Sequence, residues 1–281
     1  MIRDITIGQY YPAPSVIHKL DPRVKLAGTV IFIIMIFCIN NLAGYVVATA
    51  ALACLIRLSR VPLKYILKGL KAIFVILLFT VVLNLFLTPG TPVVQWSFIR
   101  ITQEGILMGL KMAVRLIYLI IGSSIMTLTT TPNHLTDGLE KSLGPLKKIH
   151  VPVHEIAMIM AIALRFIPIL MEETDKIMKA QQARCADFES GNVLQRAKSL
   201  VPVLVPLFIS SFRRANDLAM AMEARCYRGG EGRTKMKPLK YYRRDYIAYS
   251  IILIYIVVLI LLNIFFGPVE DMLFAALGLA I

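Results

Sequence analysis

The chain has 281 residues, of which 57% are hydrophobic, and it carries a formal net charge of +14. Soluble domains are roughly 45–50% apolar, so the composition excludes an ordinary soluble fold and predicts an integral membrane protein. Such a basic chain could bind nucleic acid, but its basic residues lie beside apolar runs and not in an aromatic-interleaved soluble patch. The positive-inside rule and attraction to anionic lipid explain the charge better. We therefore expect the lipid bilayer as a partner and no nucleic acid.

Four apolar runs in the first 130 residues predict membrane-spanning helices near 24–39, 42–56, 72–87 and 106–128. No short apolar core with a small-residue cleavage site opens the chain, so no cleavable signal peptide is expected. The segment between the second and third runs holds five basic and no acidic residues, which predicts a cytoplasmic location: Arg57, Arg60, Lys64, Lys68 and Lys71. The N-terminus should then be cytoplasmic, and the loop after the third run should face outward.

The pattern changes between residues 131 and 245, where apolar runs are shorter, prolines recur and most acidic residues occur. This region predicts long amphipathic helices that lie under or partly in the inner leaflet. A final span is expected at 246–266, and the apolar tail at 272–281 is too short for another crossing. The basic run before this span also predicts a cytoplasmic location: Arg233, Lys235, Lys237, Lys240, Arg243 and Arg244.

The predicted fold is an all-α integral membrane protein with about five transmembrane helices plus long cytoplasmic or interfacial amphipathic coupling helices. Its expected domains are the N-terminal membrane helices at 1–130, the cytoplasmic coupling-helix domain at 131–245, and the C-terminal membrane helix and tail at 246–281.

The tripeptide Ala-Arg-Cys occurs twice in the polar region, as Ala183-Arg184-Cys185 and as Ala224-Arg225-Cys226. Each copy closes a stretch that begins apolar with prolines and turns polar over four to five helical turns, and an aromatic residue follows each copy. Arginine makes bidentate bonds to carboxylates and is enriched at interface hot spots. Two matched helix ends tipped with arginine therefore predict two similar docking sites, although two solvated arginines are the plainer alternative.

Alignment of the two copies places acidic residues of the first predicted helix at the register of basic residues in the second. Glu172 and Glu173 correspond to Arg213 and Arg214. If the helices cross, these opposite charges could face one another and fix the crossing. Exposed ion pairs contribute only about 0–1 kcal/mol each, so they would set the register of the helices more than their stability.

Further segments carry a resemblance to a known family. Residues 20–26 read Leu-Asp-Pro-Arg-Val-Lys-Leu, residues 164–168 read Leu-Arg-Phe-Ile-Pro, and Thr131-Pro132 precedes Leu139-Glu140-Lys141. Together with Glu172-Glu173 and the two Ala-Arg-Cys copies, they resemble the transmembrane T component of energy-coupling factor (ECF) transporters, the ABC-type importers of vitamins and metal ions. The resemblance covers nearly the whole chain. Both copies have cysteine where the family's Ala-Arg-Gly motif has glycine.

The resemblance implies a non-catalytic coupling subunit in a prokaryotic plasma membrane. Its six Ala-Arg-Cys residues would dock on two ATP-binding cassette ATPase subunits, one copy each, and its membrane face would hold a small substrate-binding S component. It implies the shared vitamin-importer type, while a dedicated cobalt-type importer stays open, and the substrate is not fixed because another subunit recognises it.

Other kinds of site find little support. The chain has no GxxxxGK[ST] phosphate loop, no recognisable catalytic base beside a nucleophile and no paired cysteines, so no catalysis, cofactor, metal site or disulfide is expected. His150 and His154 have helical metal spacing, but Pro152 lies between them. Lys111 and Arg115 lie one turn apart within a predicted span, where either pairing inside the protein or snorkelling would explain them. A polytopic membrane enzyme and a self-sufficient permease remain the rival functions.

Overall fold

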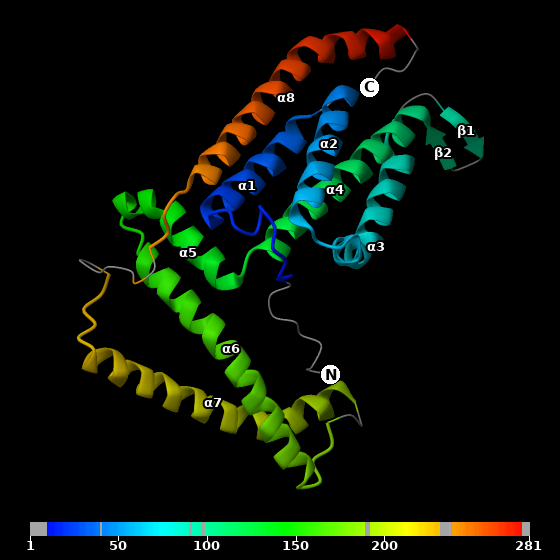
Figure 1. Cartoon of the computed structure of the whole chain (residues 1–281). Helices are drawn as coiled ribbons and strands as arrows, with labels where there is room; N and C mark the ends of the chain where they lie inside the picture. Colours follow the sequence, from blue (N-terminus) through cyan, green and yellow to red (C-terminus); the bar gives the residue numbers. More distant parts are fainter. Residues whose placement is uncertain are drawn as a thin grey trace. The chain divides into compact units, whose positions relative to one another are not determined.

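A computed structural model describes residues 10–39, 41–89, 92–96, 99–188, 192–230, 236 and 238–276 (Figure 1). The predicted helical class is confirmed. The helices are α1 (Pro22–Cys38), α2 (Leu42–Ser59), α3 (Leu63–Leu87), α4 (Gln103–Thr129), α5 (Pro132–Ser142), the 3₁₀ helix η2 (Gly144–Ile149), α6 (Val153–Gln182), α7 (Val193–Ala224) and α8 (Arg243–Ala276). Of the predicted cytoplasmic basic run, Arg233, Lys235 and Lys237 lie outside the described residues.

The chain divides into two compact units. The membrane unit holds α1 to α4, the first part of α5, and α8, and it is formed from the described residues within 8–138 and 239–281. The crossed-helix unit lies between them in sequence, in residues 139–238, and holds α6 and α7. The crossed-helix unit is therefore an insertion into the membrane unit.

Length and composition make four helices candidates to cross a membrane: α2, α4, α6 and α8. A fifth candidate is α3, if its two halves, bent by 58°, form one span. The expected number of about five spans is thus confirmed, but two helices differ from the sequence reading. We expected α6 to be interfacial, yet it is long and apolar enough to cross, while α1, with 17 residues, is at the lower limit of spanning length.

The described residues form one short β-hairpin, between α3 and α4. Strand β1 (Pro92–Trp96) pairs antiparallel with β2 (Ile99–Thr102), where a loop was expected. Thr102 caps α4 by accepting a hydrogen bond from Gly105 N–H at 3.1 Å, and its hydroxyl donates to the Thr88 carbonyl at 2.9 Å. A Cβ at Gly105 would lie 3.0 Å from the Asn84 carbonyl oxygen, so glycine is needed for the close approach of α3 and α4.

A strap of residues 10–20 lies against the end of α4. Tyr11 N–H donates to the Leu128 carbonyl at 2.9 Å. His18 bonds the Tyr11 carbonyl through Nε2 and the Ser15 hydroxyl through Nδ1. A carbonyl only accepts, so Nε2 carries the proton, and burial lowers the pKa of His18. Lys25 of α1 completes the attachment by donating to the Thr129 carbonyl at 2.8 Å.

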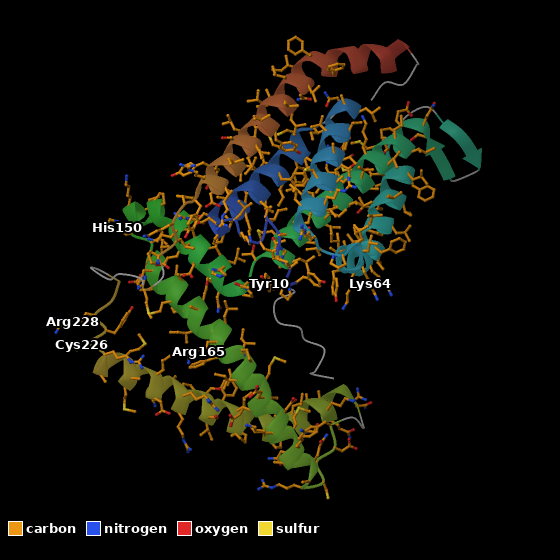
Figure 2. The ribbon with its side chains drawn as sticks, in the orientation of Figure 1. Tyr10, Lys64, His150, Arg165, Cys226 and Arg228 are labelled. Carbon is orange, nitrogen blue, oxygen red and sulfur yellow. The ribbon has the colours of Figure 1, made fainter. Side chains whose placement is uncertain are left out.

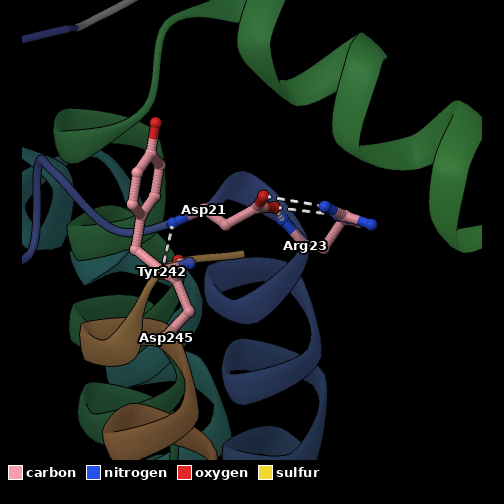
Figure 3. Close-up of polar contacts among 4 residues, drawn as sticks. All are labelled: Asp21, Arg23, Tyr242 and Asp245. Carbon is pink, nitrogen blue, oxygen red and sulfur yellow. Dashed lines mark hydrogen bonds and ion pairs between the residues drawn. The ribbon is translucent and has the colours of Figure 1, made fainter. Parts of the chain in front are cut away.

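The first residues of α1 and α8 are joined by a buried carboxylate (Figure 3). Asp245 is fully buried, and it accepts hydrogen bonds from Asp21 N–H at 2.9 Å and Tyr242 N–H at 2.8 Å. Asp21 caps α1, and its carboxylate also holds Arg23 by two bonds of 3.0 Å. The Arg23 guanidinium lies 3.9 Å from the ring centre of Tyr241. The first and last helices of the membrane unit are thus fixed to each other at this end.

The chain also leaves the membrane unit beside this junction. Gly138 of α5 packs on Pro22 so closely that a Cβ would lie 3.0 Å from the proline Cβ. Leu139 begins the crossed-helix unit, and the chain returns at residue 239, two residues before Tyr241. Both connections to the insertion therefore meet the first turn of α1. We name Asp21, Pro22, Arg23, Gly138 and Asp245 the junction.

Replacement of Asp245 by Ala should destabilise the protein by about 3 kcal/mol, because two backbone N–H groups would lose their acceptor in a buried position. Asp245→Asn should cost less, since its carbonyl oxygen can still accept one bond. Denaturant titration of the purified chain in mixed micelles measures the change. Asp217→Ala, at an exposed position on α7, is the control and should change stability by no more than about 0.5 kcal/mol. An Asp245→Ala chain as stable as the parent would contradict this role for the junction.

Candidate functional site

Two long helices cross in the crossed-helix unit (Figure 1). Helix α6 has 30 residues and α7 has 32, and both continue through internal prolines at Pro168, Pro202 and Pro206. An internal proline removes the hydrogen bond to the carbonyl four residues earlier. Pro206 thereby frees the Pro202 carbonyl, which instead accepts a hydrogen bond from Gln181 Nε2 at 3.4 Å. The prolines of α7 thus supply an acceptor at the crossing.

A second contact at the crossing is the ion pair between Glu173 and Arg214, with Nη2 and Oε2 2.5 Å apart. The structure thus brings together one of the two pairs that the alignment suggested. Their neighbours Glu172 and Arg213 are exposed and form no ion pair with each other in the described residues. The Glu173 and Arg214 side chains are 27% and 38% exposed, so water screens the pair and limits its contribution to about 1 kcal/mol.

The first Ala-Arg-Cys copy forms the turn that ends α6. Cys185 has a φ of 65°, in the left-handed region. Its N–H donates to the Gln182 carbonyl at 2.9 Å, and Ala186 N–H donates to the Gln181 carbonyl at 3.0 Å. This pair of bonds around a left-handed residue is the Schellman motif, which usually has glycine at that residue. Arg184 is the last residue before the left-handed position.

The second copy forms the same turn at the end of α7. Cys226 has a φ of 56°. Its N–H donates to the Glu223 carbonyl at 2.8 Å, and Tyr227 N–H donates to the Met222 carbonyl at 3.0 Å. Arg225 again precedes the left-handed cysteine. The two copies therefore share a backbone conformation and a hydrogen-bond pattern as well as a sequence.

The left-handed residue in each turn is cysteine, where the motif of the resembled family has glycine. A residue with a Cβ in the left-handed region costs about 1–2 kcal/mol. Cys185 and Cys226 are both exposed. The substitution thus preserves the turn that glycine would form, and it adds a thiol beside each arginine.

All six residues of the two copies are exposed. Within the described part of the chain, neither Arg184 nor Arg225 makes a side-chain hydrogen bond or ion pair. Each arginine lies eleven residues beyond the ion-paired residue of its own helix, Glu173 or Arg214, which is about 16 Å along an α-helix. The two turns are thus placed equivalently with respect to the crossing. Figure 2 labels Cys226 at the end of α7.

A contact at the start of α6 also holds the segment that follows the second turn. His154 Nδ1 lies 3.0 Å from Glu140 Oε1. Gly230 lies against the same ring, so that a Cβ there would be 2.5 Å from His154 Cδ2. Cys226 is only four residues before Gly230. The second turn is therefore tied to the beginning of α6, and we name Glu140, His154 and Gly230 the latch.

The latch was not anticipated, because His154 was considered only as a metal ligand with His150. The described residues contain no group of three or more potential metal ligands. The close packing at Gly230 was not anticipated either, since its partner His154 lies 76 residues earlier in the sequence.

Arg115 turns inward in the membrane unit. Its Nη2 donates to the Ile39 carbonyl at 3.0 Å, at the end of α1. This carbonyl carries part of the negative end of the helix dipole, so the cation is placed against a partial charge and not against an acid. Sequence reasoning left internal pairing and snorkelling open for Arg115, and the structure shows a backbone acceptor inside the protein.

An apolar stripe runs along one side of α7. Its members form two rows that each repeat every four residues, and their side chains are 42–69% exposed: Leu200, Val201, Leu204, Val205, Phe208, Ile209 and Phe212. On another side, Val203 is 3% exposed. Exposed apolar surface of this extent marks a site of contact with protein or membrane.

Comparison with known proteins agrees with this architecture. The family described as "CbiQ: Cobalt transport protein" matches residues 13–236. The energy-coupling factor transporter transmembrane protein EcfT of Clostridium kluyveri is 58% identical over 269 residues, covering 95% of this chain and all of that protein. EcfT of Ruminiclostridium cellulolyticum is 55% identical over 95% of this chain and all of that protein, and EcfT of Bacillus subtilis is 48% identical over 87% and 93%.

These relatives are named as transmembrane transporter components, which confirms the expectation that the chain is not an enzyme. The several apolar helices and the relatives agree in indicating a multi-pass membrane protein that assembles with other ECF subunits. The chain belongs to the CbiQ/EcfT family, the transmembrane T components of ECF transporters.

Proposed function

We propose that this T component couples two ATP-binding cassette ATPase subunits to a membrane-embedded S component, and that residues 131–245 form its coupling domain on the cytoplasmic side. The observation that carries the proposal is the pair of matching turns. Two exposed arginines, presented by the same Schellman motif at equivalent distances from one crossing, suit two partners with the same kind of socket. Each arginine would bind an acidic group on one ATPase.

Movement would pass from these turns through the crossing. When the ATPases close, the ends of α6 and α7 shift relative to each other, and rigid helices carry the displacement past Glu173 and Arg214. The latch adds a second connection, because Gly230 follows the α7 turn and lies against His154 at the start of α6. A shift of the second turn would therefore act on α6 at two points, at its start through the latch and at the crossing through Arg214.

The S component would rest on the apolar stripe of α7, where its own apolar surface would cover residues that are more than two-fifths exposed in the isolated chain. We propose vitamins or related micronutrients as the cargo and a shared set of S components, with the T component itself making no contact that selects the substrate. The printed names of the relatives support an energy-coupling factor transporter, and the cobalt-transport description of the family supports a metal-ion importer as the second candidate.

Simultaneous replacement of Arg184 and Arg225 by Glu should abolish copurification of the ATPases and substrate uptake, because an acidic socket would repel the new carboxylates. Co-expression of the chain with its ATPases and S component, followed by pull-down and an uptake assay, measures both effects.

Two double variants serve as controls for the arginine replacements. Lys176→Ala with Lys198→Ala removes two exposed charges from the same helices, and Cys185→Gly with Cys226→Gly keeps both turns. Both should assemble and transport normally. Normal uptake by the Arg184→Glu, Arg225→Glu chain would refute docking through these turns.

The two exposed thiols allow docking of the ATPases to be tested without replacing either arginine. A maleimide should label Cys185 and Cys226 rapidly in the purified chain, since both side chains are exposed. Assembly with the ATPases should slow labelling at both positions by tenfold or more, while an S component alone should leave the rates unchanged. Peptide mapping by mass spectrometry separates these sites from Cys38 and Cys54, which serve as internal references. Equal rates with and without ATPases would contradict the proposal.

The crossing ion pair should matter for transport more than for stability. Glu173→Arg or Arg214→Glu alone places like charges together and should reduce uptake, and the two combined should restore it. A double-mutant cycle on the free energy of unfolding should give a coupling energy of about 0.5–1 kcal/mol, as expected for a partly exposed pair. Failure of the combined exchange to restore uptake would show that the pair does not set the crossing.

A further inference from the structure

An open groove lies at the turn between α2 and α3, in the membrane unit. Its volume is about 580 Å³, and it is lined by Ala53, Ile56, Arg57, Arg60, Val61, Pro62 and Leu63. Five of these residues are apolar, and the two arginines supply the charge. The groove thus combines an apolar wall with two cations, which is the combination that an amphipathic anion requires.

The positive charge of this groove has no acidic neighbour in sequence. No aspartate or glutamate occurs between Asp21 and Glu104, whereas Lys64, Lys68 and Lys71 continue the basic series along α3. The nearest preceding acid, Asp21, is buried and bonded to Arg23. Neither Arg57 nor Arg60 forms an ion pair in the described residues. An anion from outside the chain would therefore meet uncompensated charge.

Arg60 occupies a position that disfavours it. It ends α2 with a φ of 55°, in the left-handed region where glycine and asparagine are the usual residues. One branch of its guanidinium reaches the Pro14 carbonyl at 3.4 Å, and the side chain is otherwise exposed. Backbone strain of this kind is found where a side chain has a role that offsets its cost. Here the strained residue places a cation at the rim of the groove.

The groove also lies at one edge of the helical bundle. Tyr65, beside the groove on α3, packs against Tyr11 with ring centres 5.1 Å apart. Tyr11 in turn bonds the Leu128 carbonyl at the end of α4. The start of α3 and the end of α4 are thus connected through Tyr11 beside the groove, and basic residues at the ends of candidate spans are typical of the headgroup region.

We propose that this groove binds the headgroup of an anionic phospholipid, with its phosphate at Arg57 and Arg60 and its glycerol and upper acyl carbons along Ala53, Ile56 and Leu63. A free phosphate ion would use the same cations, but it would gain nothing from the apolar wall. The lipid is therefore the better match, and the site is distinct from the docking turns and the apolar stripe.

Native mass spectrometry of the purified full chain tests this assignment. The detergent-solubilised protein is titrated with phosphatidylglycerol and, separately, with phosphatidylcholine. We expect one phosphatidylglycerol to be retained at concentrations where phosphatidylcholine is not. Arg57→Gln with Arg60→Gln should weaken that retention roughly 30-fold, from about fivefold for each cation near a membrane surface.

Arg60→Gly separates lipid binding from folding. Glycine removes the cation but also relieves the left-handed strain, so the variant should be at least as stable as the parent while retaining phosphatidylglycerol roughly fivefold less tightly. The matched control is Lys68→Gln with Lys71→Gln, which removes two exposed charges from α3 outside the groove and should leave retention nearly unchanged.

Three outcomes would overturn the proposal. Equal retention of phosphatidylcholine would show that the groove does not distinguish an anionic headgroup from a zwitterionic one. An equal loss in the Lys68→Gln, Lys71→Gln chain would show only general attraction to a basic surface. Displacement of the lipid by inorganic phosphate at millimolar concentration would show that the cations serve a soluble anion and that the apolar wall does not contribute.

Discussion

The buried carboxylate of Asp245 is the interaction on which the arrangement of this chain depends. It ends a long excursion, because the chain leaves the membrane unit after Gly138 and returns a hundred residues later. Two backbone N–H groups at the carboxylate fix the returning α8 to Asp21, and Pro22 receives the departing α5. Both points where the chain passes to and from the insertion therefore lie against the first turn of α1. The Leu-Asp-Pro-Arg segment thus contacts both chain connections as well as capping its helix.

The two Ala-Arg-Cys turns depend on a different constraint, the left-handed residue that stops each helix. A Schellman turn releases the chain from the helix axis within one residue and leaves the preceding side chain at the very end of the helix. Arg184 and Arg225 occupy this place. Cysteine satisfies the constraint less well than glycine, at about 1–2 kcal/mol per turn. A partner that binds the folded turn would offset this cost through linkage.

Sequence alone predicted the helical membrane fold, most of the candidate spans and the two matched helix ends, since each leaves a local pattern. It also showed that Glu173 and Arg214 could face each other if the helices cross, because they share a matched register. It did not predict Asp245 as the link to α1, nor Gly230 against His154, because these contacts join residues 224 and 76 positions apart. The hairpin before α4 was missed because Pro92–Trp96 has no regular alternation. Helix α6 was predicted to be interfacial because it contains charges, but its apolar window and its length make it a candidate span.

The polar contacts at the crossing of α6 and α7 are weak. In the described residues they include the partly exposed Glu173–Arg214 ion pair and the long hydrogen bond from Gln181 to the Pro202 carbonyl, and the latch joins the start of α6 to the segment after α7. Each of the two interactions at the crossing contributes about 1 kcal/mol, so they set the register of the helices more than their stability. Exposed apolar residues on α7 and unpaired arginines at both ends leave the geometry to be set by whatever covers them. If the chain transmits motion as proposed, a firm junction in the membrane unit and weak polar contacts at the crossing suit that role.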